Sequence, residues 1–363
     1  MKKLTYISLI IMMIFCVNHA FSAQNETKKC SGFSSFFCKS LHFTGNGMRY
    51  WYEMPGGFMR ITNIPYNRLG CKKCHATSCD KCHAIQKNGL NYFSLSKAED
   101  MNTCFTCHSR EKVTILKDKK IHETGISVHF SAGMNCMDCH TKKDIHGSGI
   151  LYKSMRDSGA VDANCMKCHG SGDDAPVYNS KLRPHRVHKG RLDCAACHVS
   201  ATMTCYNCHF QRFIETKIKK GNFFPMKSWV LLMNFKGKVT TGNVMTLIYK
   251  GKKFIAYAPY FTHSIMAEGR KCNECHGNRA IQLIKHGKRV PVVDYKDGKI
   301  IPWKGIVPCV PDKLKWVYLD KKGNKWIPIK NNVKETIQFV SYGKPLTAKQ
   351  MQKLMIPFGI KKK

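Results

Sequence analysis

One short motif, repeated eight times, constrains the fold of this chain more than any other feature. Sixteen of the 20 cysteines form Cys-x-x-Cys pairs, and a histidine directly follows every pair. The paired cysteines are Cys71, Cys74, Cys79, Cys82, Cys104, Cys107, Cys136, Cys139, Cys165, Cys168, Cys194, Cys197, Cys205, Cys208, Cys272 and Cys275. The histidines that follow them are His75, His83, His108, His140, His169, His198, His209 and His276.

Cys-x-x-Cys-His is the attachment signature of haem c. Two thiols add to the two vinyl groups of one porphyrin, and the next residue offers its imidazole to the iron as the proximal ligand. Zinc ribbons use Cys-x-x-Cys pairs but do not require a histidine beside each pair. Thioredoxin-like redox motifs occur singly within a βαβ unit. The sequence therefore predicts eight covalently attached haems, each with its iron.

Eight further histidines match the number of predicted haems, once His19 is removed with the predicted leader. An iron with two imidazole ligands transfers electrons but cannot bind a substrate. We therefore expect six or more of these histidines to be distal ligands of bis-histidine haems. Methionine is the alternative distal ligand, and Met101, Met134, Met137 and Met166 lie near motifs, although methionine also fills cores. The candidate distal histidines are His42, His122, His129, His146, His185, His188, His263 and His286.

The motif array resembles the multihaem cytochromes c, which include cytochrome c3-type carriers and the octahaem reductases and oxidoreductases. The resemblance covers residues 71–276 and rests on the eight motifs and on the histidines near them, such as His146 six residues after His140. It implies covalent haem c and an electron-transfer role. Low-potential bis-histidine haems would suit anaerobic respiration.

The density of motifs predicts a fold built around the cofactors. Eight motifs in 206 residues leave about 26 residues for each haem, too few for separate cores. We expect a mostly irregular chain with short α-helices that carry the motifs around a multihaem core, in which the haems form a continuous electron path. The predicted domains are a signal peptide at 1–23, an octahaem domain at 24–290 and a basic, β-rich segment without haem at 291–363.

The C-terminal half adds small antiparallel β-hairpin elements to this fold class. Three apolar runs at 228–235, 239–249 and 254–261 are separated by Lys-Gly turns, which predicts a meander inserted at about 211–262. Turn residues at Asp297-Gly298 and within 320–325 predict two further hairpins. Thr347 is placed to cap a helix over 348–355.

The N-terminus predicts export. Lys2 and Lys3 precede an apolar run over 4–17, and the small residues at 20–23 offer a cleavage site near Ala23. A lipoprotein at Cys16 and an uncleaved anchor are the alternatives, although Phe15 is bulky for a lipobox and the run is short for a membrane span. We expect a periplasmic protein, with an extracellular location as the other possibility.

The formal net charge of +37 indicates what kind of partner the protein attracts, and it does not predict the fold. From residue 277 onward, 20 Lys and Arg face 5 Asp and Glu. An exported basic protein is not expected to bind nucleic acid. We expect acidic redox proteins as partners, with docking to a membrane surface or a quinol dehydrogenase and oligomerisation as further possibilities.

Three cysteines fall outside both the motifs and the leader. Cys30 and Cys38 are candidates for a disulfide in an oxidising compartment, which leaves Cys309 unpaired. An alternative is that Cys38-Lys39 belongs to a ninth, lysine-ligated haem site. Ser35 stands where the first cysteine of that motif would be required.

Two functions follow from these features. The first is an electron-transfer cytochrome of the periplasm or cell exterior, favoured by the count of spare histidines. The second is an octahaem reductase of nitrogen or sulfur oxyanions with one open catalytic haem, whose residues the sequence does not identify. The absence of Cys-x-x-Cys-Lys and a tail rich in hairpins rather than long helices both favour the carrier.

Overall fold

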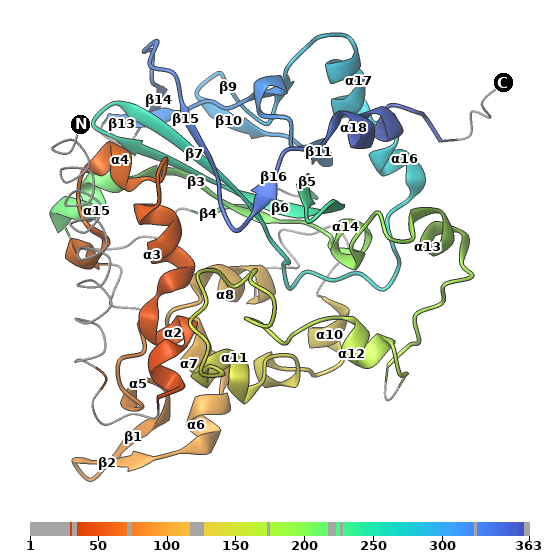
Figure 1. Cartoon of the computed structure of the whole chain (residues 1–363). Helices are drawn as coiled ribbons and strands as arrows, with labels where there is room; N and C mark the ends of the chain where they lie inside the picture. Colours follow the sequence, from red (N-terminus) through yellow and green to blue (C-terminus); the bar gives the residue numbers. More distant parts are fainter. Residues whose placement is uncertain are drawn as a thin grey trace, which may run out of the picture.

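The computed structural model describes residues 30, 35–70, 75–116, 127–172, 175–216, 223–225, 228–322 and 325–358. The predicted leader, Cys71, Cys74 and His122 lie outside the described residues. The chain is mostly irregular, with short helices and small strand pairs, as the motif density predicted. Figure 1 shows the helices that carry motifs two to six on one side of a twisted sheet, with the C-terminal hairpins and helices on its other side.

One short helix of the N-terminal region begins at a residue whose side chain caps it. Ser40 accepts a hydrogen bond from the Phe43 amide at the start of α2, and Gly45 ends this helix with a left-handed φ of 64°. The helices of this region pack on the sheet through Tyr52, Phe58 and Tyr66, which are buried. The elements of this region are 3-10 helix η2 (Phe37–Lys39), α2 (Leu41–Thr44), α3 (Asn46–Glu53), α4 (Met59–Thr62) and 3-10 helix η3 (Tyr66–Arg68).

Most described motifs lie on a helix or helical turn, as predicted. Motifs two to six are carried in order by α5 (Asp80–His83), α7 (Met101–Phe105), 3-10 helix η5 (Cys136–Asp138), α12 (Met166–His169) and α14 (Cys194–His198), and motif eight by α16 (Cys272–Cys275). The hairpin between motifs two and three consists of β1 (Ala84–Lys87) and β2 (Leu90–Phe93). Within the part of the chain that the structure describes, the other helices between motifs are α6 (Leu95–Glu99), α8 (Ser109–Leu116), α10 (Val128–Ser131), α11 (Lys142–His146), α13 (Arg183–His188) and α15 (Phe210–Thr216).

The seventh motif differs from the predicted helix because it lies on strand β3 (Met203–His209). The strand pairs in parallel with β6 (Lys238–Tyr249), and the register shifts between Cys205 and Cys208. Asn207 lies within that irregularity with a left-handed φ of 54°, which asparagine tolerates better than most residues. Its side chain exchanges two hydrogen bonds of 2.8 Å with the backbone of Leu319. These contacts hold the motif in the sheet.

The predicted meander is confirmed as β5 (Val230–Phe235), β6 and β7 (Lys252–Pro259), with antiparallel pairing throughout. It is the centre of an eight-stranded sheet rather than a separate small insert. β3 and β11 (Ile306–Pro308) pair in parallel with β6 and β5, and β15 (Thr336–Phe339) pairs in parallel with β7. β4 (Phe223–Pro225) and β16 (Gly343–Lys344) pair with β3 and β5. The sheet thus joins the motif region to the C-terminal segment.

Both predicted C-terminal hairpins are confirmed. β9 (Val293–Lys296) pairs with β10 (Lys299–Pro302) around Asp297-Gly298, and β13 (Leu319–Lys322) pairs with β14 (Lys325–Pro328). Helix α18 (Ala348–Leu354) begins at Thr347, whose side chain accepts from the Gln350 amide. The other elements are β8 (Val290–Pro291), β12 (Leu314–Lys315), 3-10 helix η6 (Pro311–Lys313) and α17 (Arg279–Lys285). The main hydrophobic core is formed by the meander together with these C-terminal elements, and Trp229 and Tyr257 are fully buried in it.

The leftover cysteines behave as predicted. Cys30 and Cys38 form a disulfide, with Cα atoms 5.9 Å apart. Cys309 is unpaired and buried in the main core, where burial raises the pKa of its thiol. Within the described residues, no helix is both long and apolar enough to span a bilayer.

Candidate haem sites

A cavity of about 4290 Å³ runs between the helices that carry the motifs and the sheet. A pocket for a single small ligand or cofactor occupies about 300–1,000 Å³, so this cavity has room for several cofactors. Cysteine and histidine residues of motifs two to seven line it, together with His75 of the first motif. The chain thus surrounds one continuous space with the residues that the sequence assigns to haem attachment.

Six motif histidines each face one of the candidate distal histidines across this region. The ring centres of every pair are separated by 6.1–6.3 Å. The pairs are His83 with His146, His108 with His42, His140 with His263, His169 with His129, His198 with His185, and His276 with His188. Partners come from distant parts of the chain in several pairs, so the fold brings them together.

This separation matches the space that an iron with two imidazole ligands requires. A metal–imidazole bond measures about 2.0 Å. A five-membered ring with bonds of about 1.33 Å has a radius of about 1.1 Å, so two ring centres on either side of one iron lie roughly 6.2 Å apart. The residues present therefore fit haem at these six motifs.

Hydrogen bonds select the ring nitrogen that remains available to a metal. When Nδ1–H donates to an acceptor, Nε2 is left as the ligand. His169 and His185 donate from Nδ1 to the carbonyls of Pro176 and Asn179, each at 2.7 Å. Equivalent bonds from Nδ1 to backbone carbonyls are made by His83, His188, His198 and His276. These hydrogen bonds within the protein thus orient the six imidazoles without any contribution from a cofactor.

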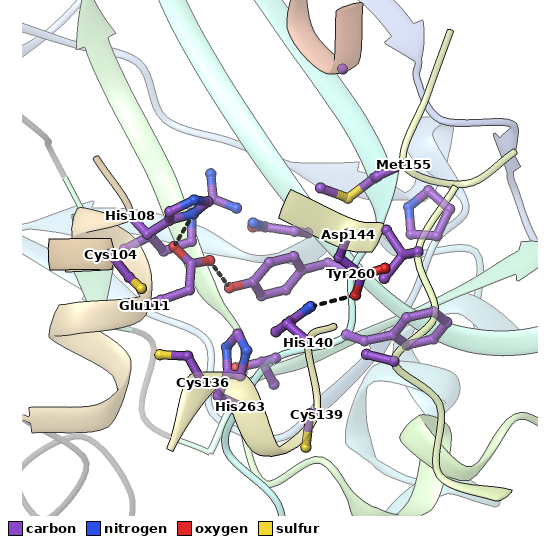
Figure 2. Close-up of a pocket in the computed structure, with 18 of the residues that line it drawn as sticks. Cys104, His108, Glu111, Cys136, Cys139, His140, Asp144, Met155, Tyr260 and His263 are labelled. Carbon is purple, nitrogen blue, oxygen red and sulfur yellow. Dashed lines mark hydrogen bonds and ion pairs between the residues drawn. The ribbon is translucent and has the colours of Figure 1, made fainter. Parts of the chain in front are cut away.

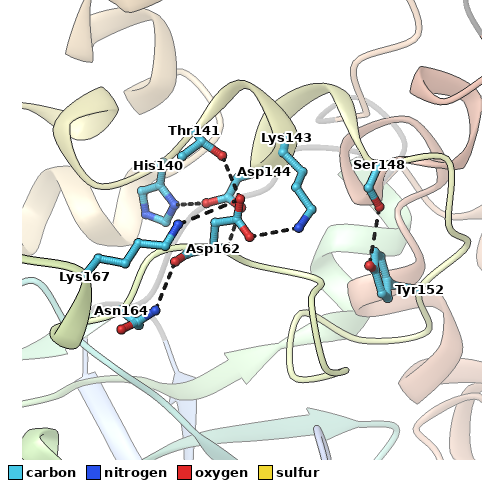
Figure 3. A network of polar contacts seen from close by, with 9 residues as sticks. All are labelled: His140, Thr141, Lys143, Asp144, Ser148, Tyr152, Asp162, Asn164 and Lys167. Carbon is cyan, nitrogen blue, oxygen red and sulfur yellow. Dashed lines mark hydrogen bonds and ion pairs between the residues drawn. The ribbon is translucent and has the colours of Figure 1, made fainter.

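His140 is held by a carboxylate instead of a carbonyl. Its Nδ1 lies 3.0 Å from Oδ2 of Asp144, whose side chain is only 4% exposed. Asp144 also accepts the Asp162 amide at 2.6 Å, and Lys143 binds the Asp162 carboxylate at 2.9 Å. Figure 3 shows this network beside the fourth motif. The contact with Lys143 lowers the pKa of Asp162, so the Asp162 carboxylate is anionic at neutral pH.

A second polar group lies between the third and fourth motifs. The Tyr260 hydroxyl donates to Glu111 Oε1 at 3.0 Å, and the other oxygen of Glu111 is 3.9 Å from His108 Nδ1. The Arg110 guanidinium lies over the Tyr260 ring, 5.1 Å from its centre. Figure 2 shows Glu111 and Tyr260 between His108 and His263. Sequence reasoning did not single out these residues or Asp144, because Arg110, Glu111 and Asp144 lie near motifs without belonging to their pattern, and Tyr260 lies 12 residues before the nearest motif.

Burial keeps the distal ligand candidate His42 neutral. Burial, followed by the neighbouring His108, lowers the pKa of His42 to about 4. A neutral imidazole is the form that binds a metal. The site thus favours the ligating form of His42 over its protonated form.

Motif cysteines of different haem sites lie near one another in a regular order. The thiols of Cys104 and Cys136 are close enough that each shifts the pKa of the other, and so are those of Cys165 and Cys194. Electrostatic interactions also link three further pairs of motifs, through Cys82 and Cys104, Cys139 and Cys168, and Cys197 and Cys272. These contacts connect motifs two, three, four, five, six and eight in that order. Helix α13 supports the last step, since its His185 and His188 face motifs six and eight.

The other predicted histidines are placed differently. His75 Nε2 lies 3.2 Å from the Tyr66 hydroxyl, and its ring packs against the backbone of Gly45, so as placed it does not present Nε2 to an iron. His209 faces Asp320 and Trp326. His286 is exposed at the end of α17, with Nδ1 bonded to the Gln282 carbonyl at 2.8 Å. His122 lies outside the described residues.

Comparison with known proteins agrees with this arrangement. Residues 128–210, which contain motifs four to seven, match the family model of cytochrome c3. No curated protein and no solved structure matches the chain. The family match covers less than a quarter of the 363 residues, yet the matched residues contain four of the eight motifs assigned to covalent haem attachment. The chain is therefore of the multihaem c-type cytochrome kind, with covalently bound haem c, iron and a role in electron transport.

Proposed function

We propose that this protein is a periplasmic or extracellular octahaem cytochrome c that transfers electrons in anaerobic respiration. The six histidine pairs with ring centres 6.1–6.3 Å apart carry the proposal, because two imidazoles on one iron leave no position for a substrate. Haem, when bound, supplies the one-electron chemistry. The chain fixes the imidazoles and holds neighbouring sites together.

The order of the motif cysteines supports a path for electrons. Each thioether sulfur would be bonded to the edge of its own porphyrin, so cysteines that interact electrostatically imply porphyrin edges that lie near one another. The contacts between Cys104 and Cys136, and between Cys165 and Cys194, favour rapid transfer between those sites. We infer a path through motifs two, three, four, five, six and eight.

Charge supports redox proteins with acidic surfaces as the partners. The excess of Lys and Arg is strong over the whole chain and continues through the C-terminal segment. Such a field attracts acidic surfaces and raises the rate of encounter. Docking to a quinol dehydrogenase at the membrane belongs to the same proposal.

Electron paramagnetic resonance of the oxidised protein tests the proposed ligation. We expect low-spin ferric signals from at least six haems, and alkaline pyridine absorbance is expected to give eight haems per chain. His188→Ala removes the imidazole that faces His276 and should convert one haem to high spin. His286→Ala is the matched control, because this exposed histidine faces no other imidazole within the described residues, and it should leave the spectrum unchanged.

Two results would contradict the proposal. Fewer than six low-spin haems in the unmodified protein would mean that the histidine pairs do not bind iron together. A His188→Ala spectrum identical to that of the unmodified protein would remove His188 from the ligand set.

A further inference from the structure

Two arginines, Arg110 and Arg156, lie in the wall of the cavity that the motif residues line, beside the segment 260–263. The Arg110 guanidinium lies over the Tyr260 ring, and the Arg156 guanidinium lies over the Phe261 ring, 4.2 Å from its centre. In both arginines the Nε atom is buried and has no hydrogen-bond partner among the described residues. The cavity wall therefore contains two cationic donors that no described residue uses.

The fold fixes both the segment 260–263 and the turn that carries Arg156. The Tyr260 amide donates to the Thr241 carbonyl on β6 at 3.0 Å, which anchors the segment to the sheet. Asp157 accepts hydrogen bonds from the backbone amides of residues 153–154, at 2.8 and 3.3 Å, and so closes the turn that carries Arg156. The position of the Arg156 guanidinium is thus set by a turn whose own polar groups are paired.

A buried guanidinium is costly unless an anion lies beside it. Burial lowers the pKa of Arg156 to about 10. Within the part of the chain that the structure describes, neither Arg110 nor Arg156 forms an ion pair with a carboxylate. Glu111, next to Arg110 in the chain, instead accepts from the Tyr260 hydroxyl at 3.0 Å. An anion that the polypeptide itself does not supply would therefore stabilise this part of the wall.

The group that the cavity would hold carries such anions. Each haem has two propionate carboxylates at its rim, and a guanidinium binds a carboxylate through parallel N–H donors. The segment 260–263 ends at His263, which faces His140 of the fourth motif with ring centres 6.3 Å apart. We propose that Arg110 and Arg156 bind the propionates of the haem at the fourth motif. This inference rests on the proposed haem attachment and adds the residues that hold the rim of one haem.

The proposed contacts have a consequence for the reduction potential. A buried cation beside a haem favours the reduced iron, because it stabilises the added electron. Without the two guanidiniums, the negative charge of the propionates would add to that of Asp144, which lies beside His140. Arg110 and Arg156 therefore limit how far the potential of the fourth haem falls.

Arg156→Gln tests this inference through the reduction potentials of single haems. The loss of the buried cation should lower the potential of one haem in a spectroelectrochemical titration. Lys153→Gln removes the same charge from an exposed side chain three residues earlier, and as the matched control it should leave all potentials unchanged. Arg110→Gln should lower the potential of the same haem, and Lys112→Gln, exposed on the same helix, is its control.

A conservative variant separates a direct contact from a general effect of charge or folding. Arg156→Lys keeps the charge but lacks the planar pair of donors. It should retain most of the potential, yet it should shift one propionate bending band in the resonance Raman spectrum. A role of Arg156 remote from the haem would not move this band, so an unchanged band overturns the inference.

Removal of single haems assigns the effect. When Cys136→Ser with Cys139→Ser has removed the fourth haem, Arg156→Gln should change no potential. When Cys272→Ser with Cys275→Ser has removed the eighth haem instead, Arg156→Gln should still lower one potential. A shift that survives loss of the fourth haem overturns the inference, as do unchanged potentials in Arg156→Gln alone. In either case the unmodified protein still contains eight haems and six low-spin signals, so failure here is distinct from failure of the proposed function.

Discussion

At the scale of single residues, the contact between His140 and Asp144 distinguishes the fourth haem site from the others. Four other motif histidines donate Nδ1–H to neutral backbone carbonyls, whereas His140 meets a buried carboxylate. A carboxylate that accepts from a ligating imidazole makes it more basic and stabilises the ferric iron. The fourth haem should therefore have one of the lowest reduction potentials in the chain.

Asp144→Asn should raise the reduction potential of one haem. An iron–nitrogen bond of about 2.0 Å, roughly 2.2 Å between the two ring nitrogens and the 3.0 Å between His140 Nδ1 and Asp144 would place the carboxylate about 7 Å from an iron bound at Nε2. At an effective dielectric constant of 20, two unit charges at about that distance interact by about 2.4 kcal/mol, which corresponds to about 100 mV. We expect a rise on the order of 50–100 mV in a spectroelectrochemical titration. Asp162→Asn removes the more exposed neighbouring carboxylate and should have a smaller effect. A fall in potential, or no change, would contradict the assignment.

Ligand candidates were predictable at this scale, but their pairing was not. A histidine directly after Cys-x-x-Cys is identified by its position alone. Its partner is set by the tertiary fold, since His140 meets His263 and His276 meets His188, far away along the chain. Asp144 has no motif of its own, because a carboxylate four residues after a histidine is common on any helix.

At the scale of elements, strand β3 shows how one asparagine changes the local structure of a motif. Six other described motifs contain helical turns, and helical turns were the sequence-based prediction for the seventh as well. Asn207 instead binds Leu319, 112 residues later in the chain. No short sequence pattern predicts a contact between residues so far apart in the chain. The meander was predictable because its Lys-Gly turns and apolar runs are local, whereas the strands that join it in parallel come from distant segments.

Asn207→Ala should destabilise the protein by roughly 2–4 kcal/mol. The loss leaves buried backbone groups of Leu319 unsatisfied, at about 1–3 kcal/mol, and the left-handed φ of 54° costs alanine about 1–2 kcal/mol. Thermal unfolding followed by circular dichroism measures this change. Asn207→Gly loses the same hydrogen bonds but tolerates the left-handed φ. It should therefore be less destabilising than Asn207→Ala by the free-energy cost of that φ alone. Asn91→Ala, in the exposed strand β2, is the control and should stay within about 0.5 kcal/mol of the unmodified protein.

At the scale of the whole molecule, the C-terminal segment completes the sheet and extends the positive surface. Strands β11, β15 and β16 bind to the meander, and the segment also contacts the seventh motif through Leu319. This segment, residues 291–363, supplies a Lys and Arg excess of 11. The haem propionates offset part of the total charge of +37 from within, but the exposed lysines of this segment remain available to partners.

Electron transfer with charged reagents should therefore depend strongly on salt. Oxidation of the reduced protein by ferricyanide, an anion, should slow by roughly tenfold between 0.01 and 0.5 M ionic strength, because the Debye length falls from about 30 Å to less than 8 Å. A cationic cobalt complex of similar size is the matched control, and its rate should rise over the same range. Stopped-flow absorbance at the haem bands measures both rates. If the two oxidants respond to salt in the same way, the positive surface does not direct electron exchange. The proposal that the partners are acidic proteins would then lose its main support.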